Sequence, residues 1–105
     1  MSQKIAFKMK LKPGYLDDYK KRHEDLWPEL KELFASHGIS DFTIHFDSST
    51  NELLAVHSVS GELSAQDLGS YPIVQKWWAF MADIMETYPD GSPVTTPLKQ
   101  VFHLK

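Results

Sequence analysis

The spacing of the apolar residues changes near residue 13, and this change constrains the fold more than any other feature. In residues 4–12 apolar side chains stand at every second position, which is typical of a strand with one buried face. A proline–glycine pair then ends the strand. In residues 15–37 the apolar side chains recur every third or fourth position. That pattern predicts a long helix, which Gly38 ends.

One residue interrupts this helical pattern. Pro28 lacks a backbone N–H, and inside a helix its ring clashes with the preceding turn. We therefore expect the helix to kink or break near Trp27, or to give way to a second helix that has Pro28 as its first residue. In both cases Pro28 determines the backbone between His23 and Trp27.

The middle of the chain has the pattern of a hairpin. Residues 42–46 and 53–59 are predicted strands, and the polar cluster at residues 47–51 is the turn that joins them. A weak helical connector is expected at residues 61–69. These segments place two neighbouring antiparallel strands after the helical region.

A second amphipathic helix follows the connector. Ser70 is predicted to cap this helix, with Pro72 near its first turn and an apolar face that extends to Met85. Residues 88–97 contain three prolines and a glycine, which predicts a structured loop. Residues 98–104 have the pattern of a final strand.

The predicted order of elements is β-α-β-β-α-β, the ferredoxin-like α+β arrangement in which an antiparallel sheet carries both helices on one face. We expect a single domain over residues 1–105. A chain of this length buries only a modest part of its surface alone. Apolar strand residues such as Val56, Val101 and Phe42 or Phe46 cannot all face the helices. A second copy is the simplest cover for the other face, so we expect a homodimer, in the form of a dimeric α+β barrel.

Charge and composition exclude several classes of protein. The formal net charge is -3, and acidic residues flank the basic run at residues 20–22. We therefore interpret it as a solvated helix face and expect no nucleic-acid partner. The absence of cysteine excludes disulfides, thiolate nucleophiles and cysteine-ligated metals. No apolar signal core or stretch of ~18 apolar residues is present, so we expect a cytoplasmic protein that does not bind membranes.

The histidines do not have the spacing of a preassembled metal site. They stand at positions 23, 37, 45, 57 and 103, without an H-x-x-x-H or H-x-H pattern. His45, His57 and His103 lie on three predicted strands and could converge across the sheet. Because no cysteine or suitably spaced carboxylate accompanies them, we expect no metal.

His23 is the strongest candidate for chemistry. Tyr19 and Trp27 stand four residues before and after it, so we expect all three on neighbouring turns of one helix face. A neutral imidazole can give or take a proton near pH 7. An imidazole with a phenol and aromatic rings suits an uncharged, partly apolar ligand. The alternative is a core histidine bonded to a backbone carbonyl.

Trp77 and Trp78 are the second candidate. Adjacent helix residues point about 100° apart, so one indole can lie in the core while the other faces a cleft. The two indoles are then either core residues or a wall that stacks on the C–H face of a sugar and donates an N–H to a hydroxyl.

Taken together, these features resemble the L-rhamnose mutarotase family. The segments that carry the resemblance, in the order and spacing of the family, are Tyr19-Lys20-Lys21-Arg22-His23, Leu26-Trp27-Pro28-Glu29-Leu30, Ser36-His37-Gly38, Trp77-Trp78 with Met81 and Met85, Pro89-Asp90-Gly91-Ser92-Pro93, and Val101-Phe102-His103-Leu104. They run nearly from end to end of the chain. The resemblance implies a small homodimeric ferredoxin-like enzyme without a cofactor that interconverts the α and β anomers of L-rhamnose.

The same resemblance assigns roles to individual residues. It implies that His23 is the proton donor. The sugar-binding positions correspond to Tyr19, Trp77 and Trp78. Phe42 falls where the family has a further sugar-binding tyrosine, so that hydroxyl is missing here. Tyr88 replaces the asparagine that usually precedes the Pro-Asp-x-Ser-Pro loop.

Anomer exchange requires proton transfer but no group that binds charge. The ring opens when one proton leaves the anomeric hydroxyl and another reaches the ring oxygen. The carbonyl then turns, and the ring closes on its other face. We expect His23 to protonate the ring oxygen and to recover the proton on closure. The partner base is left open between Tyr19, a water molecule and a carboxylate of the pocket.

Several alternatives stay open at this point. One is a mutarotase for a related sugar such as L-fucose or L-lyxose. Another is a cofactor-free monooxygenase on the same dimeric fold. A third is a non-catalytic dimeric binding module in which His23 and the tryptophans are core residues. The fold does not decide among them, because such folds host many functions.

Overall fold

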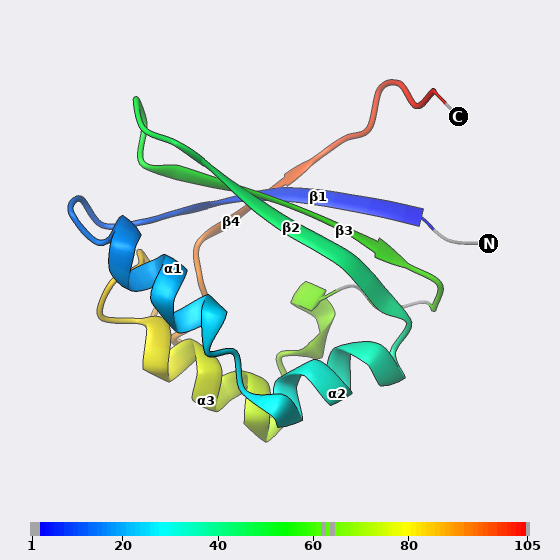
Figure 1. Ribbon diagram of the computed structural model, residues 1–105, viewed down its shortest axis with the longest axis horizontal. Helices are drawn as coiled ribbons and strands as arrows, with labels where there is room; N and C mark the ends of the chain where they lie inside the picture. The colour runs from blue at the N-terminus through cyan, green and yellow to red at the C-terminus, as the bar shows by residue number, and fades with distance from the viewer. Residues whose placement is uncertain (1–2, 62, 64, 105) are drawn as a thin grey trace.

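The computed structural model describes residues 3–61, 63 and 65–104 of the chain. The elements, in order, are β1 (Gln3–Lys10), α1 (Leu16–Glu24), α2 (Pro28–Ser36), β2 (Ile39–Asp47), β3 (Glu52–Val59), the short 3-10 helix η1 (Ala65–Leu68), α3 (Pro72–Met81) and β4 (Thr95–Leu98). The strands form one antiparallel sheet in the order β2-β3-β1-β4, and the helices lie on one side of it (Figure 1). The predicted α+β class is confirmed, and this strand order is compatible with a ferredoxin-like arrangement.

The long helix predicted for residues 15–37 is two helices, and the second alternative for Pro28 is the observed one. α1 ends at Glu24, and α2 begins at Pro28. A proline needs no N–H at this first position, and it favours extended backbone in the residue before it. Trp27 accordingly has a ψ of 131°. Gly38 follows α2 with a φ of 71°, as predicted for a helix end.

The helix predicted after the connector differs at both ends. Tyr71 rather than Ser70 is the N-terminal cap of α3, and no side chain caps it. Pro72 explains this, because the residue before a proline is held in extended backbone. The helix ends at Met81 and not near Met85 as predicted. Ile84 is buried, but it lies beyond the helix. With 10 residues α3 is the longest helix described, and no helix in the described ranges is long and apolar enough to cross a membrane.

The hairpin prediction is confirmed, and the connector prediction is confirmed in part. β2 and β3 pair in antiparallel register around the turn at residues 47–51. The weak helical connector expected at residues 61–69 contains η1, whereas residues 62 and 64 lie outside the described part of the chain.

The prediction of the last strand was wrong. β4 covers Thr95–Leu98, and its pairing with β1 ends where Leu98 lies opposite Ala6. The apolar side chains that suggested a strand at residues 98–104 are largely exposed: Val101 (90%), Phe102 (77%) and Leu104 (80%). Their alternation resembles a strand, but a single chain offers them nothing to pack against.

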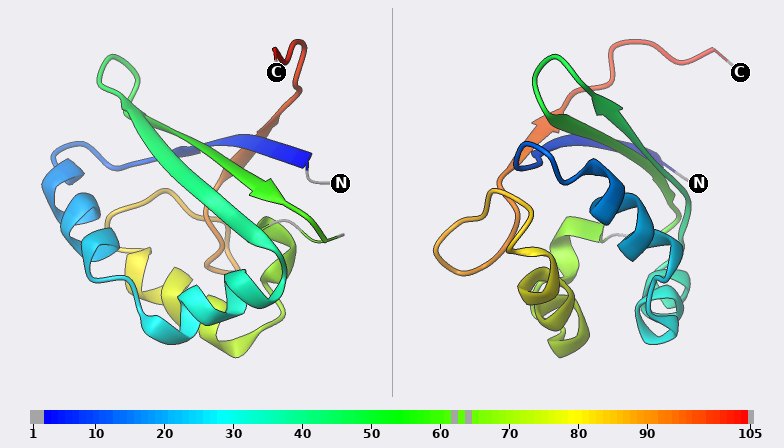
Figure 2. Two further views of the ribbon diagram at one scale, coloured as in Figure 1. Left: turned by 45° about the vertical axis from the view of Figure 1, so that its right-hand side comes forward. Right: turned by 60° about the vertical axis from the view of Figure 1, so that its left-hand side comes forward.

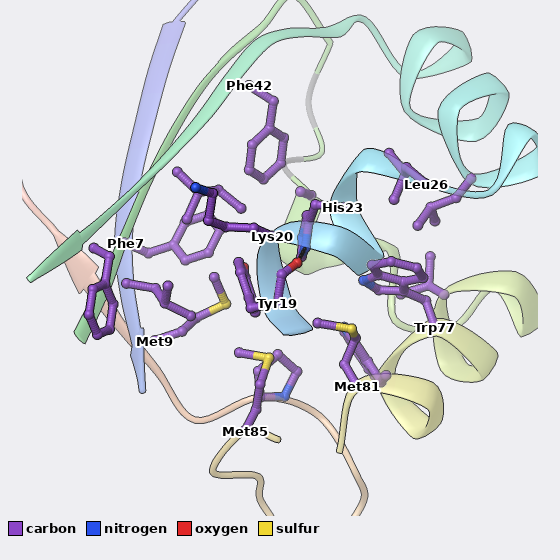
Figure 3. Close-up of a pocket in the computed structure, with 18 of the residues that line it drawn as sticks. Phe7, Met9, Tyr19, Lys20, His23, Leu26, Phe42, Trp77, Met81 and Met85 are labelled. Atoms are coloured by element: carbon purple, nitrogen blue, oxygen red, sulfur yellow. Dashed lines mark hydrogen bonds between the residues drawn. The ribbon is translucent and has the colours of Figure 1, made fainter. Parts of the chain in front are cut away.

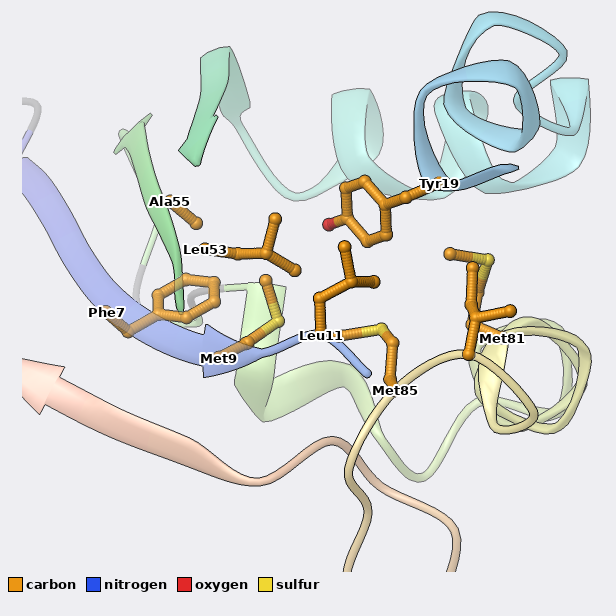
Figure 4. Packing of buried hydrophobic residues seen from close by; sticks show 9 residues of the cluster. Phe7, Met9, Leu11, Tyr19, Leu53, Ala55, Met81 and Met85 are labelled. Atoms are coloured by element: carbon orange, nitrogen blue, oxygen red, sulfur yellow. The ribbon is translucent and has the colours of Figure 1, made fainter. Parts of the chain in front are cut away.

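The core lies between the sheet and the helices in two clusters. The first joins the inner face of the sheet to α1 and the segment after α3, and contains Phe7, Met9, Leu11, Tyr19, Leu53, Ala55, Met81, Ile84 and Met85 (Figure 4). The second lies around α2, η1 and α3, and contains Leu30, Ile39, Val59, Ala65, Leu68 and Val74. Burial of each large aliphatic side chain stabilises the fold by roughly 1.5–3 kcal/mol. Phe42 and Trp77, both partly buried, pack against both clusters.

The opposite face of the sheet is not covered by a described helix, as the two views in Figure 2 make clear. Strand register places Ala6, Leu54 and Val56 on this outer face, with Leu98 beside Ala6. Phe42, in contrast, packs on the helix side. The prediction that the apolar strand residues divide between the two faces is therefore confirmed for Val56 and Phe42, whereas Val101 lies beyond β4.

Candidate active site

A cavity of about 640 Å³ lies between the inner face of the sheet and the helices. Its walls are mostly apolar. The polar side chains of α1 that line it are Tyr19, Lys20, His23 and Glu24, of which Figure 3 labels the first three. A concave, mainly apolar space with a few polar groups is the usual form of a small-molecule site. The sequence candidates that line this cavity are Tyr19, His23, Phe42, Trp77 and Trp78.

α1 brings Tyr19 and His23 together one turn apart. Their rings stack with centroids 4.2 Å apart and an angle of 29° between the planes. The distance from His23 Nδ1 to the Tyr19 carbonyl oxygen is 3.0 Å. Because a carbonyl oxygen can only accept, Nδ1 carries the proton in this hydrogen bond. In the neutral ring Nε2 therefore holds a lone pair, and it has no hydrogen bond to the described residues.

The surroundings of His23 favour the neutral imidazole. Burial lowers the pKa of His23 from its ordinary value near 6.5, and the hydrogen bond to the Tyr19 carbonyl raises it by less. At neutral pH the ring is thus a base whose available nitrogen is Nε2. Once it takes a proton there, it becomes a stronger acid than an exposed histidine.

Tyr19 contributes a protonated phenol. Its side chain is 5% exposed and lines the cavity. Burial raises the pKa of Tyr19 far above its ordinary value of 10.0. The hydroxyl therefore stays protonated at neutral pH and is suited to donate a hydrogen bond rather than to remove a proton.

Trp77 stands beside the imidazole. Its ring meets the His23 ring edge-on at a centroid distance of 5.4 Å and the Trp27 ring at 5.1 Å, with interplanar angles of 87° in both pairs. Trp78 also lines the cavity but packs against η1 and the residues after it. A Cβ atom on Gly69 would lie 2.5 Å from its ring, so glycine at this position leaves the space that the indole occupies.

Trp27 does not take the position that a continuous helix predicts. Since α1 ends at Glu24, Trp27 is the N-terminal cap of α2 and is not among the residues that line the cavity. Its ring instead contacts Trp77 and Phe80, the latter at 5.5 Å. The predicted three-residue face is thus reduced to Tyr19 and His23, with Trp77 from α3 beside them.

Phe42 lies in a stack of three rings at the side of the cavity. Its ring centroid is 6.0 Å from that of Phe34 and 4.9 Å from that of His57, and both pairs are stacked. His57 is fully buried; its Nδ1 donates to the Ser58 carbonyl, and its Nε2 accepts from the Ala65 amide. Burial lowers the pKa of His57, so this ring is neutral as well.

Comparison with known proteins identifies the family. The family profile described as L-rhamnose mutarotase matches residues 4–104. The chain is 56% identical to the L-rhamnose mutarotase of Phocaeicola vulgatus and 57% identical to that of Bacteroides thetaiotaomicron, in each case over 94% of this chain and 95% of the relative. It also matches the crystal structure of L-rhamnose mutarotase from Formosa agariphila with a TM-score of 0.91, at 50% identity over 98% of this chain and 99% of that one. The chain belongs to the L-rhamnose mutarotase family.

Membership in this family confirms the resemblance that the sequence suggested. L-rhamnose mutarotases are isomerases, so the chain is an enzyme of that class. This finding argues against the monooxygenase and the non-catalytic binding module. The cavity holds the residues that resemblance assigned to the mutarotase site, which makes it the candidate active site.

Lys20 and His57, at or beside this candidate site, were given other interpretations in the sequence. Lys20 was interpreted as part of a solvated face, yet it lines the cavity from α1. Its position three residues before His23 was a signal, because residues i and i+3 are neighbours on a helix. His57 was considered only as a metal ligand, and no local pattern predicted that its ring would stack on Phe42.

The predicted strand histidines do not converge. His57 is buried on the inner face of the sheet, whereas His45 is exposed and paired with Leu54, which lies on the outer face. Among the residues that the structure describes, no group of three or more His, Cys, Asp or Glu side chains could hold a metal ion.

Proposed function

We propose that this chain is an L-rhamnose mutarotase that interconverts the α and β anomers by opening and closing the pyranose ring, with His23 as the residue that moves the protons. The observation that carries the proposal is the pair of nitrogens of His23. Nδ1 is held by the Tyr19 carbonyl at 3.0 Å, so Nε2 is available to a ligand in the cavity.

The chemistry needs one group that can both take and give a proton. The anomeric oxygen and the ring oxygen are bonded to the same carbon of the sugar, so a single nitrogen can serve both. Nε2 of neutral His23 removes the anomeric hydroxyl proton, the C1–O bond of the ring breaks as the carbonyl forms, and the new imidazolium delivers that proton to the ring oxygen. The sugar ring then closes on the other face of the carbonyl by the reverse steps. This sequence uses the proton-donor role of His23 without a second base.

Tyr19 acts as a donor in this proposal. Burial of the side chain keeps the hydroxyl protonated, so it donates a hydrogen bond to a sugar oxygen instead of serving as the partner base. Of the three candidates for that base, Tyr19 is thus disfavoured, whereas Glu24 is a carboxylate that lines the cavity. Hydrogen bonds to an uncharged sugar give orientation and discrimination rather than large binding energy.

The aromatic side chains suit a 6-deoxy sugar. Trp77 and Trp78 can present indole faces to C–H groups and indole N–H groups to hydroxyls. Phe42 presents only an apolar ring, flanked by Phe34 and His57. An apolar wall tolerates a methyl group better than a hydroxymethyl group.

A mutarotase for a related sugar is the second candidate. The observation in its favour is Phe42, which stands where family members carry a sugar-binding tyrosine and which offers no hydroxyl. L-Fucose and L-lyxose are the related sugars that the loss of this hydroxyl contact would favour.

We further propose that the functional form is a homodimer in which two sheets face each other as an α+β barrel. The outer face of the sheet carries Ala6, Leu54, Val56 and Leu98 and has no cover in the described chain. Such a short domain gains much from burying an additional apolar face. The single domain over residues 1–105 and the cytoplasmic location stay predictions.

Saturation transfer between the two anomeric protons, measured by NMR, tests the proposed activity on free sugars. L-Rhamnose, L-fucose and L-lyxose are compared at equal concentration with the same amount of protein. We expect the largest protein-dependent exchange rate with L-rhamnose. Faster exchange of L-fucose or L-lyxose would favour the second candidate, and no exchange above the spontaneous rate with any sugar would contradict a mutarotase.

A further inference from the structure

A polar contact joins α1 to the end of α3 just outside the cavity. The Arg22 guanidinium donates to both carboxylate oxygens of Asp83, at 2.8 and 3.1 Å, and to the Phe80 carbonyl at 2.8 Å. It also lies over the Phe80 ring, 4.7 Å from the centroid. We call this group, made of Arg22, Asp83 and Phe80, the brace.

The brace links two elements that have no other ion pair between them in the described chain. Of the salt bridges described, only the one between Arg22 and Asp83 connects α1 to the segment around α3. Figure 1 shows α1 and α3 on the same side of the sheet. Asp83 is 67% exposed, so the ion pair contributes little to stability by charge alone. The two hydrogen bonds from the guanidinium to the carboxylate, however, restrict the orientation of Arg22 relative to Asp83.

Each end of the brace lies next to a residue of the candidate site. His23 follows Arg22 directly in α1. On the other side, the Phe80 ring contacts the Trp77 ring at 5.7 Å, and Trp77 in turn meets the His23 ring at 5.4 Å. Contacts therefore lead from Arg22 through Phe80 and Trp77 to His23, which is the residue next to Arg22.

The position of the His23 imidazole relative to α3 depends on contacts between the two helices. The hydrogen bond of His23 to the Tyr19 carbonyl fixes the ring relative to α1 only, because both residues belong to α1. The indole belongs to α3. The distance from Nε2 to a sugar held on the indole thus depends on how α1 sits against α3.

We propose that Arg22 is a positioning residue for anomer exchange, which sets the place of the His23 imidazole relative to Trp77 through its bonds to Asp83 and Phe80. This inference rests on the proposed function. Because a misplacement of ~1 Å in a reacting group can cost ~10²-fold in rate, a loosened brace lowers kcat far more than it weakens sugar binding.

The test compares four variants of the full chain. Arg22→Gln removes the charge and the two hydrogen bonds to the carboxylate, Arg22→Lys keeps the charge but not both hydrogen bonds, and Asp83→Asn weakens the pair from the exposed side. Lys21→Gln is the matched control, since it removes the same charge from the adjacent, exposed residue of α1. Thermal unfolding sets a temperature at which every variant is folded.

Two measurements are made at that temperature. The first is kcat and KM for L-rhamnose from anomeric exchange at several sugar concentrations. The second is the NMR shift of the His23 ring protons in the free protein, which the neighbouring Tyr19 and Trp77 rings displace. A purely structural role would change the unfolding temperature but leave both measurements of the folded protein unaltered.

We expect Arg22→Gln to lower kcat about tenfold or more while KM changes less than about threefold, as for a misplaced reacting group. Arg22→Lys and Asp83→Asn should give intermediate losses of kcat. In all three the His23 ring shifts should move, whereas Lys21→Gln should match the wild type. If Arg22→Gln does not fold, Asp83→Asn decides alone, because its side chain is mostly exposed.

Unchanged kcat and unchanged His23 shifts in folded Arg22→Gln or Asp83→Asn would overturn the proposal. So would an equal loss in Lys21→Gln. If the wild type shows no exchange with L-rhamnose, the proposed function fails, but the His23 shifts still report whether the brace positions the imidazole.

Discussion

At the scale of single residues, the chemistry depends on the different surroundings of the two ring nitrogens of His23. Nδ1 is occupied by a backbone carbonyl four residues earlier, and Nε2 is left for the cavity. His37 repeats the first half of this pattern, with its Nδ1 at 3.1 Å from the Leu33 carbonyl. Its Nε2, however, lies 3.1 Å from the Tyr71 hydroxyl, away from the cavity. The same local geometry therefore yields a candidate catalytic group only where Nε2 is unoccupied.

The pH dependence of catalysis follows from the lowered pKa of His23. Its neutral form is the one that begins the reaction, so activity should be constant near neutral pH and fall as the imidazole gains a proton. Because burial holds the pKa of His23 below 6.5, the midpoint of this fall in kcat/KM should also lie below 6.5. Anomeric exchange measured in buffers from acid to neutral pH gives the midpoint. A midpoint above 6.5 would exclude this assignment.

The hydroxyl of Tyr19 should matter for the sugar and not for the fold. Tyr19→Phe keeps the ring that stacks on His23 and removes the hydroxyl that is proposed to donate to the sugar. We expect KM for L-rhamnose to rise about tenfold, the loss of one hydrogen bond in a buried site, with unfolding free energy changed by less than about 1 kcal/mol. Exchange kinetics and urea unfolding measure the two effects.

Tyr71→Phe is the matched control for this substitution, because the Tyr71 hydroxyl bonds His37 outside the cavity. It should leave KM unchanged. If Tyr19→Phe left KM as in the wild type, or if both variants raised it equally, the proposed contact with the sugar would be wrong.

At the scale of elements, local sequence predicted which segments are helices and strands better than where they end. Spacing alone identified the alternation before Pro13 and the amphipathic pattern after it. Pro28 and Pro72 then decided the helix starts, since each forces extended backbone on the residue before it, and this placed Trp27 and Tyr71 as caps. The contact between Trp77 and His23 could not be predicted, because it joins two helices separated by the hairpin.

Trp78 packs against Gly69 in the turn before α3, and this packing can be tested by substitution. A methyl group added at Gly69 would lie 2.5 Å from the indole, which is closer than packed atoms allow. Gly69→Ala should therefore displace Trp78, lower the unfolding free energy by about 1–3 kcal/mol and raise KM for the sugar. Ser70→Ala, at the adjacent exposed residue that caps no helix, should change neither quantity. Equal stability of Gly69→Ala and the wild type would show that Trp78 does not fill this space.

At the scale of the whole molecule, the described chain has one covered and one uncovered sheet face. The exposed apolar side chains after Leu98 are where the sequence misled, because alternation predicts a strand without saying what covers it. The candidate site was predicted more fully than this segment. Its residues His23 and Trp77 belong to segments that carry the family resemblance, and Phe42 stands where the family has a tyrosine, whereas the stacking of His57 on Phe42 comes from packing.

The proposed dimer predicts a response to charge on the outer face. Val56 lies on the central part of that face, so Val56→Lys should separate the two copies, because a buried unpaired charge is costly. Light scattering coupled to size-exclusion chromatography should give the mass of two chains for the wild type and of one chain for Val56→Lys. Ala79→Lys places the same charge on the exposed surface of α3 and should remain dimeric. A wild type with the mass of one chain would contradict the dimer.

The most direct test of the proton-transfer role of His23 is a comparison of two histidine substitutions by saturation transfer on L-rhamnose. His23→Gln and His37→Gln each remove an imidazole whose Nδ1 lies near a backbone carbonyl four residues earlier, but of the two only His23 lines the cavity. Circular dichroism verifies that both variants are folded. We predict that exchange falls at least about a hundredfold in His23→Gln, the usual effect of losing a general acid–base group, and stays at the wild-type rate in His37→Gln. Wild-type exchange in folded His23→Gln would contradict the account and move the proton transfer to another group.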